Sequence, residues 1–224
     1  MSQQQVTGRD TRADWVIMQA VHDAFRRDLD DMIGAAKRGQ APRGRWAVFR
    51  DQLTYHHTAE DEALWPAVRA KLAGDPDGMA LLAAMEDEHG LIDPLLAAVD
   101  EALLTAVDGA LAPDAAGPQV SEQLTRLKAT LASHLAHEES AALPLVSSLL
   151  TQAELTAVNR RFRKLGGLRQ ASVMFPWALS AAAPQTRDQV LRLLPPPARL
   201  LYALVWRPRY ARRAAAFFAP GGER

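Results

Sequence analysis

The amino-acid sequence predicts an all-α protein, an up-down-up-down four-helix bundle followed by a C-terminal appendage of short helices. Apolar side chains recur at helical spacing along four long segments. The connections between these segments are short and rich in glycine and proline, and short connections favour antiparallel neighbours. Apolar residues make up 48% of the chain and aromatic residues only 6%, with alanine and leucine abundant, which suits helices better than sheets.

The bundle is predicted to occupy residues 11–150. Its helices are expected at about 11–38, 45–73, 78–107 and 119–149. The breaks between them have the sequences GQAPRG at 39–44, GDPDG at 74–78 and APDAAGP at 112–118, all of which are typical of turns.

The two halves of this bundle are related by an internal repeat. A shift of 78 residues superposes the second helix on the fourth, including a His-x3-Glu pair in each. A shift of 67 residues superposes the first helix on the third, including one histidine in each, and apolar positions coincide with both shifts. The polar residues that repeat in this way are His22, His56, Glu60, His89, His134 and Glu138.

These histidines and glutamates are expected to point into the bundle core. Residues four apart share a helix face, and each His-x3-Glu pair is in register with the apolar stripe of its helix. A single histidine on such a face is more often a hydrogen-bonded core residue, and an isolated His-x3-Glu pair is often solvated. However, several imidazoles and two carboxylates in one dry core would be strongly destabilising without cations. We therefore predict a site for two metal ions.

The donor set indicates the metal. Cysteine is absent, which excludes disulfides, thiolate zinc sites, iron–sulfur clusters and cysteine nucleophiles. Two carboxylates can bridge two cations and leave the imidazoles as terminal ligands. A mixed set of this kind suits iron or manganese, whereas tetrahedral zinc usually takes fewer ligands per ion. Helix-bundle cores are a known setting for di-iron and di-manganese centres.

The repeated motif resembles the hemerythrin-like (HHE cation-binding) domain over about residues 11–150, including the prolines Pro66 and Pro144 that follow the two glutamates. The resemblance implies a non-heme site with two iron ions, manganese being the less favoured metal. It further implies that Glu60 and Glu138 are bridging ligands and that the four histidines are terminal ones. Members of this family handle dioxygen, nitric oxide or peroxide, or sense iron and oxygen.

One departure from the family bears on function. The oxygen-carrying hemerythrins have five histidine ligands, two of them one turn apart on the third helix. Here the positions one turn before and after His89 are Met85 and Asp93. We interpret this as one iron that lacks a histidine and keeps water or an exchangeable position, which disfavours a reversible oxygen carrier.

The main hypothesis is redox or detoxification chemistry on dioxygen, peroxide or nitric oxide. The alternative is an iron- or oxygen-binding sensor or storage protein without turnover, which signals through the basic tail.

Other polar residues near the motif have more than one interpretation. His57 lies about 100° around the helix from the ligand before it and is interpreted as a helix-interface or surface residue. His137 is either a support for the ligands or a fifth ligand. Glu86 belongs to an acidic run interpreted as a solvated face, although Glu86 and Asp93 stay open as additional ligands. Tyr55 is expected to pack rather than to serve the site.

Residues 151–224 are predicted to form a capping helix and a basic helical appendage rich in proline and arginine. Thr151 and Glu154 match a capping box, and Gly166 and Gly167 end the helix that it begins. Residues 160–224 contain 13 basic and 2 acidic residues, whereas residues 1–159 contain 13 basic and 24 acidic ones. The apolar residues expected to be buried if this segment docks are Trp177, Leu193, Leu201 and Trp206.

Three partners are considered for this basic segment. It could fold back on the acidic bundle and cover one end of the metal site, or contact an anionic membrane peripherally. No nucleic-acid partner is expected, because no helix-turn-helix or zinc-finger spacing is present. The start of the chain lacks the layout of a secretory signal, and no apolar run approaches the roughly 18 residues of a membrane span. We therefore expect a cytoplasmic protein that acts on small molecules, with its oligomeric state open.

Overall fold

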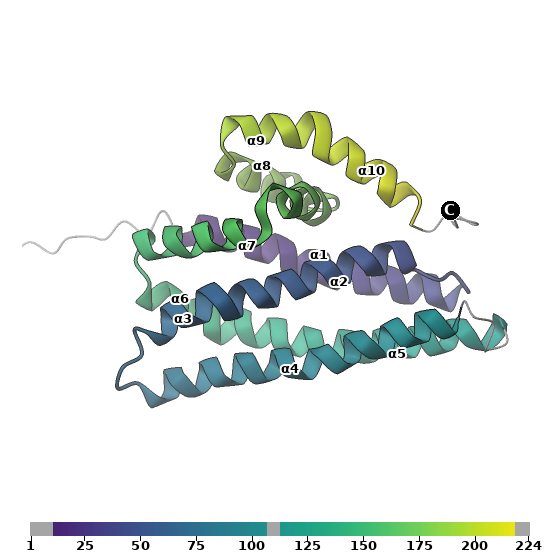
Figure 1. The fold of residues 1–224 in the computed structure, drawn as a ribbon, viewed down its shortest axis with the longest axis horizontal. Coiled ribbons are helices and arrows are strands. Elements are labelled where there is room, and N and C mark those ends of the chain that lie inside the picture. Colours follow the sequence, from purple (N-terminus) through teal and green to yellow (C-terminus); the bar gives the residue numbers. More distant parts are fainter. Residues whose placement is uncertain (1–10, 107–112, 218–224) are drawn as a thin grey trace, which may run out of the picture.

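The computed structural model describes residues 11–106 and 113–217, and every regular element within these ranges is helical (Figure 1). The predicted all-helical class is confirmed. Four long helical runs lie side by side, and the C-terminal helices cover one side of them. Helix α5 packs against α1 and α4, and α2 contacts the same two helices. The runs are α1 (Thr11–Lys37); α2 (Arg43–Ala59), η1 (Glu60–Leu64) and α3 (Trp65–Arg69); α4 (Pro76–Thr105); and α5 (Pro113–His137), η2 (Glu138–Ala142) and α6 (Leu143–Leu149).

Local sequence signals account for several helix ends. The side chain of Asp75 accepts a hydrogen bond from the backbone N–H of Gly78 at 3.0 Å, and Pro76 occupies the first turn of α4. The turns after α1 and α3 contain Gly39 and Gly74, whose φ angles are 75° and 85°. Glycine adopts this left-handed conformation without steric cost, so both turns are encoded locally.

The fourth run begins earlier than the sequence predicts. The glycine- and proline-rich stretch 112–118 predicts a turn, but α5 already begins at Pro113. Proline is accepted in the first turn of a helix, where the amide hydrogen that it lacks has no partner. A Cβ atom on Gly117 would lie 2.6 Å from the carbonyl oxygen of Ala36, so glycine here permits close packing against α1. Residue 112 and the predicted end of the third helix at 107 lie outside the described residues.

Each predicted glutamate ligand begins a π-helical turn. The backbone N–H of Trp65 donates to the carbonyl of Glu60, and that of Leu143 donates to the carbonyl of Glu138, so both bonds span five residues instead of four. A proline follows each of these donors by one position. Proline has no N–H and its ring clashes with the carbonyl four residues earlier, which a turn widened by one residue relieves. The two halves of the bundle therefore share the same irregularity at the same point.

The bundle core is divided into two apolar clusters. The larger cluster contains Phe25 and Phe49, and the smaller contains Trp65 and Val68. Along the second and third runs, the histidines and glutamate of the repeated motif fall between the residues of one cluster and those of the other. On the first and fourth runs, Val21 and Leu135 of the larger cluster lie directly beside His22 and His134. A polar layer therefore crosses the bundle with apolar packing on both sides.

The C-terminal segment folds back on the bundle. Helix α7 (Gln152–Leu179) begins at the predicted capping box and contains a kink at Gly167, where φ is 60° and ψ is −166°. It is followed by α8 (Pro184–Leu193), α9 (Pro196–Leu201), η3 (Tyr202–Trp206) and α10 (Arg207–Ala215). These helices lie over the side formed by α1 and α2 rather than over one end of the bundle (Figure 1).

Trp177 is the residue that ties this segment to the bundle core. Its side chain is fully buried, its ring lies 5.0 Å from that of Phe25, and its indole N–H donates to Asp28 at 2.8 Å. Trp206 is buried as well, but Leu193 and Leu201 are 41% and 40% exposed. The segment therefore buries its tryptophans against the protein and leaves several leucines in contact with solvent.

Among the described helices, none taken singly combines the length and the apolar character needed to cross a membrane. One bent pair, Gly117–Leu149 with Gln152–Leu179 at 119° to each other, satisfies both criteria jointly.

Candidate metal centre

The polar layer of the bundle contains all six residues that the sequence predicts to be metal ligands. All four helical runs contribute to it, and no side chain among the six is more than 8% exposed. The six are His22 on α1, His56 on α2, Glu60 on η1, His89 on α4, His134 on α5 and Glu138 on η2. Residues that are far apart in the sequence therefore meet in one buried layer.

Three of these residues, His22, His56 and Glu138, form what we call the His22 group. The Nε2 atoms of His22 and His56 are 3.2 Å apart, and His22 Nε2 lies 3.2 Å from Glu138 Oε2. One donor atom from each residue lies within 4.8 Å of the other two. This spacing suits three ligands around one cation.

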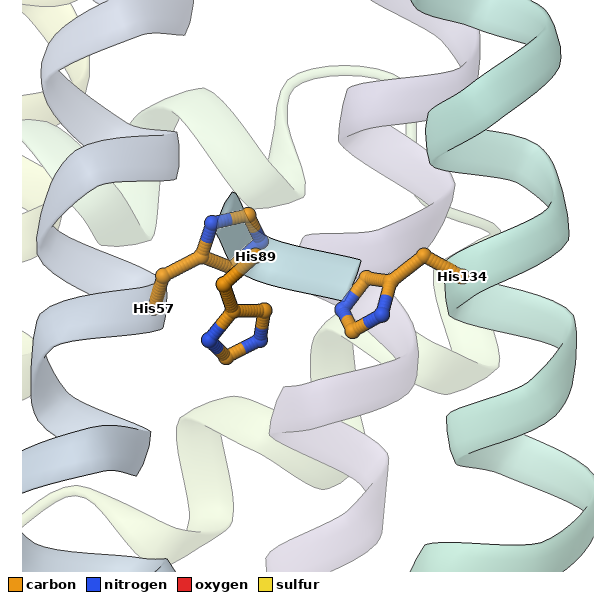
Figure 2. Close-up of side chains that lie close together, drawn as sticks. All are labelled: His57, His89 and His134. Atoms are coloured by element: carbon orange, nitrogen blue, oxygen red, sulfur yellow. The ribbon is translucent and has the colours of Figure 1, made fainter. Parts of the chain in front are cut away.

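A second set, the His57 group, consists of His57, His89 and His134 (Figure 2). The rings of His57 and His89 stack with their centroids 4.0 Å apart, and the ring of His134 stands nearly perpendicular to both. His57 is only 6% exposed, so of its two interpretations the surface position is wrong and the helix-interface position is correct. Burial and the two neighbouring imidazoles lower its pKa well below the usual range, which keeps the ring neutral and able to bind a cation.

Glu60 lies between the two groups. Its Oε1 atom is 3.3 Å from His56 Nε2, and its Oε2 atom is 3.6 Å from His89 Nε2. One carboxylate oxygen thus faces each group, which is the arrangement expected of a carboxylate that bridges two cations.

Carboxylates outside the layer orient two of the histidines. Asp61 Oδ1 lies 2.9 Å from Nδ1 of His89, and Glu139 Oε1 lies 2.7 Å from Nδ1 of His22. Glu139 also accepts a hydrogen bond from Arg26 at 2.9 Å. Each of these carboxylates directly follows a glutamate of the layer and holds a histidine from the other half of the repeat. Such contacts fix the ring so that Nε2 points into the site.

Glu88 plays the same part on α4 for two histidines of α5. Its Oε2 atom lies 2.9 Å from Nδ1 of His134, and its Oε1 atom lies 2.7 Å from Nδ1 of His137. The His137 side chain is 38% exposed. It therefore lies at the rim of the site, where it contacts Glu88. The hydrogen bonds from both histidines outweigh the effect of burial and lower the pKa of Glu88, which keeps it ionised.

The remaining sequence candidates lie away from the two groups. Glu86 is exposed and pairs with Arg69 at 2.5 Å, and Asp93 is exposed on α4. The Tyr55 hydroxyl donates to the backbone carbonyl of Phe162 at 2.7 Å, so it attaches α2 to α7. The orienting carboxylates were not predicted from the sequence, although Asp61 and Glu139 are related by the 78-residue shift, which is the signal that identifies these two.

Several buried polar atoms of the layer have no hydrogen-bond partner. They are the Nε2 atoms of His57, His89 and His134 and both carboxylate oxygens of Glu60 and Glu138. A buried polar atom without a partner costs about 1–3 kcal/mol, and more when the group is charged. Donor atoms that converge on two points and lack other partners fit a pair of bound cations, which would satisfy them together.

The electrostatics of the layer support the same interpretation. Burial and the nearby Glu138 carboxylate raise the pKa of Glu60 well above its usual range. Burial and the neighbouring imidazoles lower the pKa of His56 well below its usual range. Burial also lowers the pKa of His22, but the carboxylates of Glu138 and Glu139 outweigh it and raise that pKa to about 9. Cations would replace these protons and balance the buried negative charge.

A comparison with protein families identifies this arrangement. The model of the hemerythrin HHE cation-binding domain matches residues 14–146, which include both groups and Glu60. The chain belongs to the hemerythrin HHE cation-binding family. The resemblance noted in the sequence is thereby confirmed, and the buried histidines and glutamates identify a metal-binding hemerythrin-like protein. No curated protein and no solved structure matches this hemerythrin-like chain.

Proposed function

We propose that this chain is a non-heme di-iron protein that carries out redox chemistry on dioxygen, peroxide or nitric oxide. The observation that supports this function best is the presence of two buried three-donor groups joined by Glu60. In this proposal one iron is held by the His22 group and the other by the His57 group. Glu60 bridges the two, and Glu138 is the second bridge. The four runs alternate in direction in the up-down-up-down order.

The donor chemistry supports iron over other metals. Three imidazoles alone, as in the His57 group, would also suit zinc. The His22 group adds a carboxylate, and Glu60 connects the groups, which favours paired iron or manganese ions in a helix bundle. Iron is the proposed metal because such a pair supplies the one-electron and dioxygen chemistry that redox turnover requires.

The chain itself contributes orientation and a dry environment. Asp61, Glu88 and Glu139 hold the imidazoles with Nε2 toward the centre. The apolar clusters on both sides exclude bulk water, which strengthens every electrostatic interaction within the layer. His56 is the proposed ligand that lines the large apolar cavity described below, so a small molecule approaching through that cavity meets the His22 group first.

A second function is favoured by a specific observation. His57 raises the number of imidazoles in the layer to five, so the argument from four histidines against reversible oxygen binding loses its basis. An iron- or oxygen-binding sensor or storage protein without turnover is therefore the alternative. In that case the basic C-terminal segment, which packs on α1 and α2, would transmit the state of the site.

Metal analysis combined with reactivity distinguishes these functions. The purified protein should contain about two iron ions per chain, and His56→Ala or Glu138→Ala should retain at most about one, since each loses a buried ligand. Unchanged iron in both variants would contradict the site. Rapid loss of added peroxide or nitric oxide would support the redox protein, whereas a stable absorbing species on exposure to dioxygen would support the sensor or carrier.

A further inference from the structure

An apolar cavity of about 400 Å³ lies between the bundle and the C-terminal segment. Side chains from α1, α2, α7, α8 and η3 line it, and most of them are apolar, including Trp15, Met18, Met174 and Trp206. The volume is within the range of about 300–1,000 Å³ that is typical of small-molecule sites. The fold therefore forms a partly open cavity of ligand size beside the candidate metal centre.

Several polar side chains line this cavity, among them Asn159 and the cationic Arg163, and three of the others have hydrogen-bond partners. The side-chain amide of Gln170 donates to Gln52 at 2.9 Å, and the Tyr55 hydroxyl donates to a backbone carbonyl of α7. Among the described residues, no aspartate or glutamate lines the cavity. His56 is the one proposed metal ligand in its lining. The interior therefore favours an apolar chain, and a chain that fills it lies against His56.

A basic groove adjoins the cavity. It is lined by Arg169, Arg209 and Arg213 and shares Leu168 and Trp206 with the cavity lining. Within the described part of the chain, none of these guanidinium groups has a carboxylate partner, and no acidic residue lines the groove. Three arginines brought together without acidic partners form a site for an anion such as a carboxylate or phosphate.

We propose that the cavity and the groove together bind one anionic amphiphile, with its apolar chain in the cavity and its anionic head on the arginines. The apolar lining excludes a polar chain, and the absence of acidic residues disfavours a cationic head. The binding itself does not depend on the metal centre. Its consequence, that such a molecule is a substrate or effector of the site beside His56, rests on the proposed function.

A membrane surface is the competing partner for this region. The exposed leucines of the segment are Leu165, Leu168, Leu193, Leu200, Leu201 and Leu204. These side chains and the arginines could also contact an anionic bilayer. However, the cavity is a partly open recess between the bundle and the C-terminal segment, which receives a single apolar chain and is too narrow for a bilayer surface. The observations therefore favour an individual amphiphile over a bilayer.

The first test measures binding of dodecanoate to the full-length protein below its critical micelle concentration. Trp15, Trp177 and Trp206 line the cavity, so their fluorescence reports occupancy directly. We expect saturable binding of one dodecanoate per chain, at least about tenfold tighter than that of dodecyltrimethylammonium or of inorganic phosphate. Equal affinity for the cationic amphiphile, or for phosphate alone, would overturn the proposal.

Two variants separate the cavity from the groove. Met174→Trp should fill the cavity and abolish dodecanoate binding. Arg213→Glu should weaken it by at least about tenfold at about 0.15 M salt, where distant charges are screened. The matched control is Arg212→Glu, an identical charge change on the neighbouring exposed residue, which does not line the groove. A similar loss in Arg212→Glu would mean that net charge, not the groove, governs binding.

Vesicles and metal content complete the test. Association with vesicles containing anionic lipid, without any binding of monomeric dodecanoate, would overturn the proposal in favour of a membrane surface. Iron content is measured on the same samples, and it should stay unchanged in Arg213→Glu. Normal iron with no amphiphile binding refutes this inference alone, whereas amphiphile binding by a protein that takes up no iron refutes only the proposed function.

Discussion

At the scale of single residues, the centre depends on contacts between the two halves of the repeat. The carboxylate that follows each glutamate of the layer holds a histidine of the opposite half, as Glu139 does for His22 and Asp61 does for His89. Each half therefore provides proposed ligands and also orients proposed ligands of the other half. A ligand set built in this way is sensitive to changes at residues that do not themselves face the site.

His57 gives the first prediction at this scale. His57→Ala should lower the iron content from about two ions per chain to about one, because the His57 group loses one of its three donors. Metal analysis of purified protein measures this directly. His137→Ala is the control, since that side chain is at the rim and bonds to Glu88, and its iron content should stay near that of the parent. A parent-like iron content in His57→Ala would exclude His57 as a ligand.

Glu88 gives the second prediction. Glu88→Gln should weaken metal binding by about 10- to 100-fold, the usual effect of removing a group that orients a metal ligand. The amide removes the negative charge that His134 and His137 both contact. Competition with a chelator reports the affinity. Glu86→Gln, two residues away and paired with Arg69 on the surface, should match the parent, and an equal loss in both variants would point to a general charge effect.

At the scale of helices, prolines and caps determine where each element changes direction. The π turns at Glu60 and Glu138 follow from the prolines beyond them, and the capping box begins α7 where the chain leaves the bundle. In that box the Thr151 hydroxyl accepts from the backbone N–H of Glu154, and the Glu154 carboxylate accepts from the backbone N–H of Thr151. This short local motif therefore fixes where α7 begins. Because α7 forms one wall of the cavity, the motif also helps to position that wall.

The capping box gives the prediction for this scale. Thr151→Ala should lower the free energy of unfolding by about 1 kcal/mol, the typical cost of a lost N-cap. Denaturant unfolding measures the change. The control is Thr156→Ala, whose hydroxyl bonds only to a carbonyl one turn earlier, and it should cost less because alanine favours helix interiors. Equal effects of both substitutions would show that the cap does not anchor α7.

The contribution of this capping box to the free energy of unfolding depends on pH, and the sign of that dependence follows from the pKa of Glu154. Hydrogen bonds from Lys71 and from Thr151 lower the pKa of Glu154 to about 2. A carboxylate with a lowered pKa contributes stability above its unfolded value near 4.5, and that contribution is lost as the pH falls through about 2. The difference between Thr151→Ala and the parent should therefore persist across the neutral range.

At the scale of the whole molecule, the C-terminal segment packs into the core of the bundle and is not a loosely attached appendage. Trp177 enters the larger apolar cluster beside Phe25, and its indole N–H satisfies the buried carboxylate of Asp28. Phe25 in turn contacts His56, with ring centroids 5.4 Å apart. The appendage therefore packs against the residues that support the metal centre, and it forms the cavity with them.

Trp177 gives the prediction for this scale. Trp177→Ala should lower the free energy of unfolding by about 3–5 kcal/mol, because it leaves a large void in the core. Trp177→Phe should cost less, since it keeps most of the apolar volume, although it loses some packing and the hydrogen bond to Asp28. Leu204→Ala, at a side chain that is 67% exposed, should change the value by no more than about 0.5 kcal/mol. A loss below about 1 kcal/mol for Trp177→Ala would mean that the segment is not part of the core.

The sequence by itself determined the helical class and the inward-facing positions of the six repeated histidines and glutamates, because both depend on local periodicity along each helix. It also indicated the capping box and the break at Gly167. The interior position of His57 was decided only by the tertiary structure, because the rotation of α2 relative to α4 determines which flanking position is buried. The tertiary structure alone also decided the orienting role of Glu88 and the cavity beside His56. Both features arise where helices that are distant in the sequence pack side by side, and no pattern within one helix encodes such a contact.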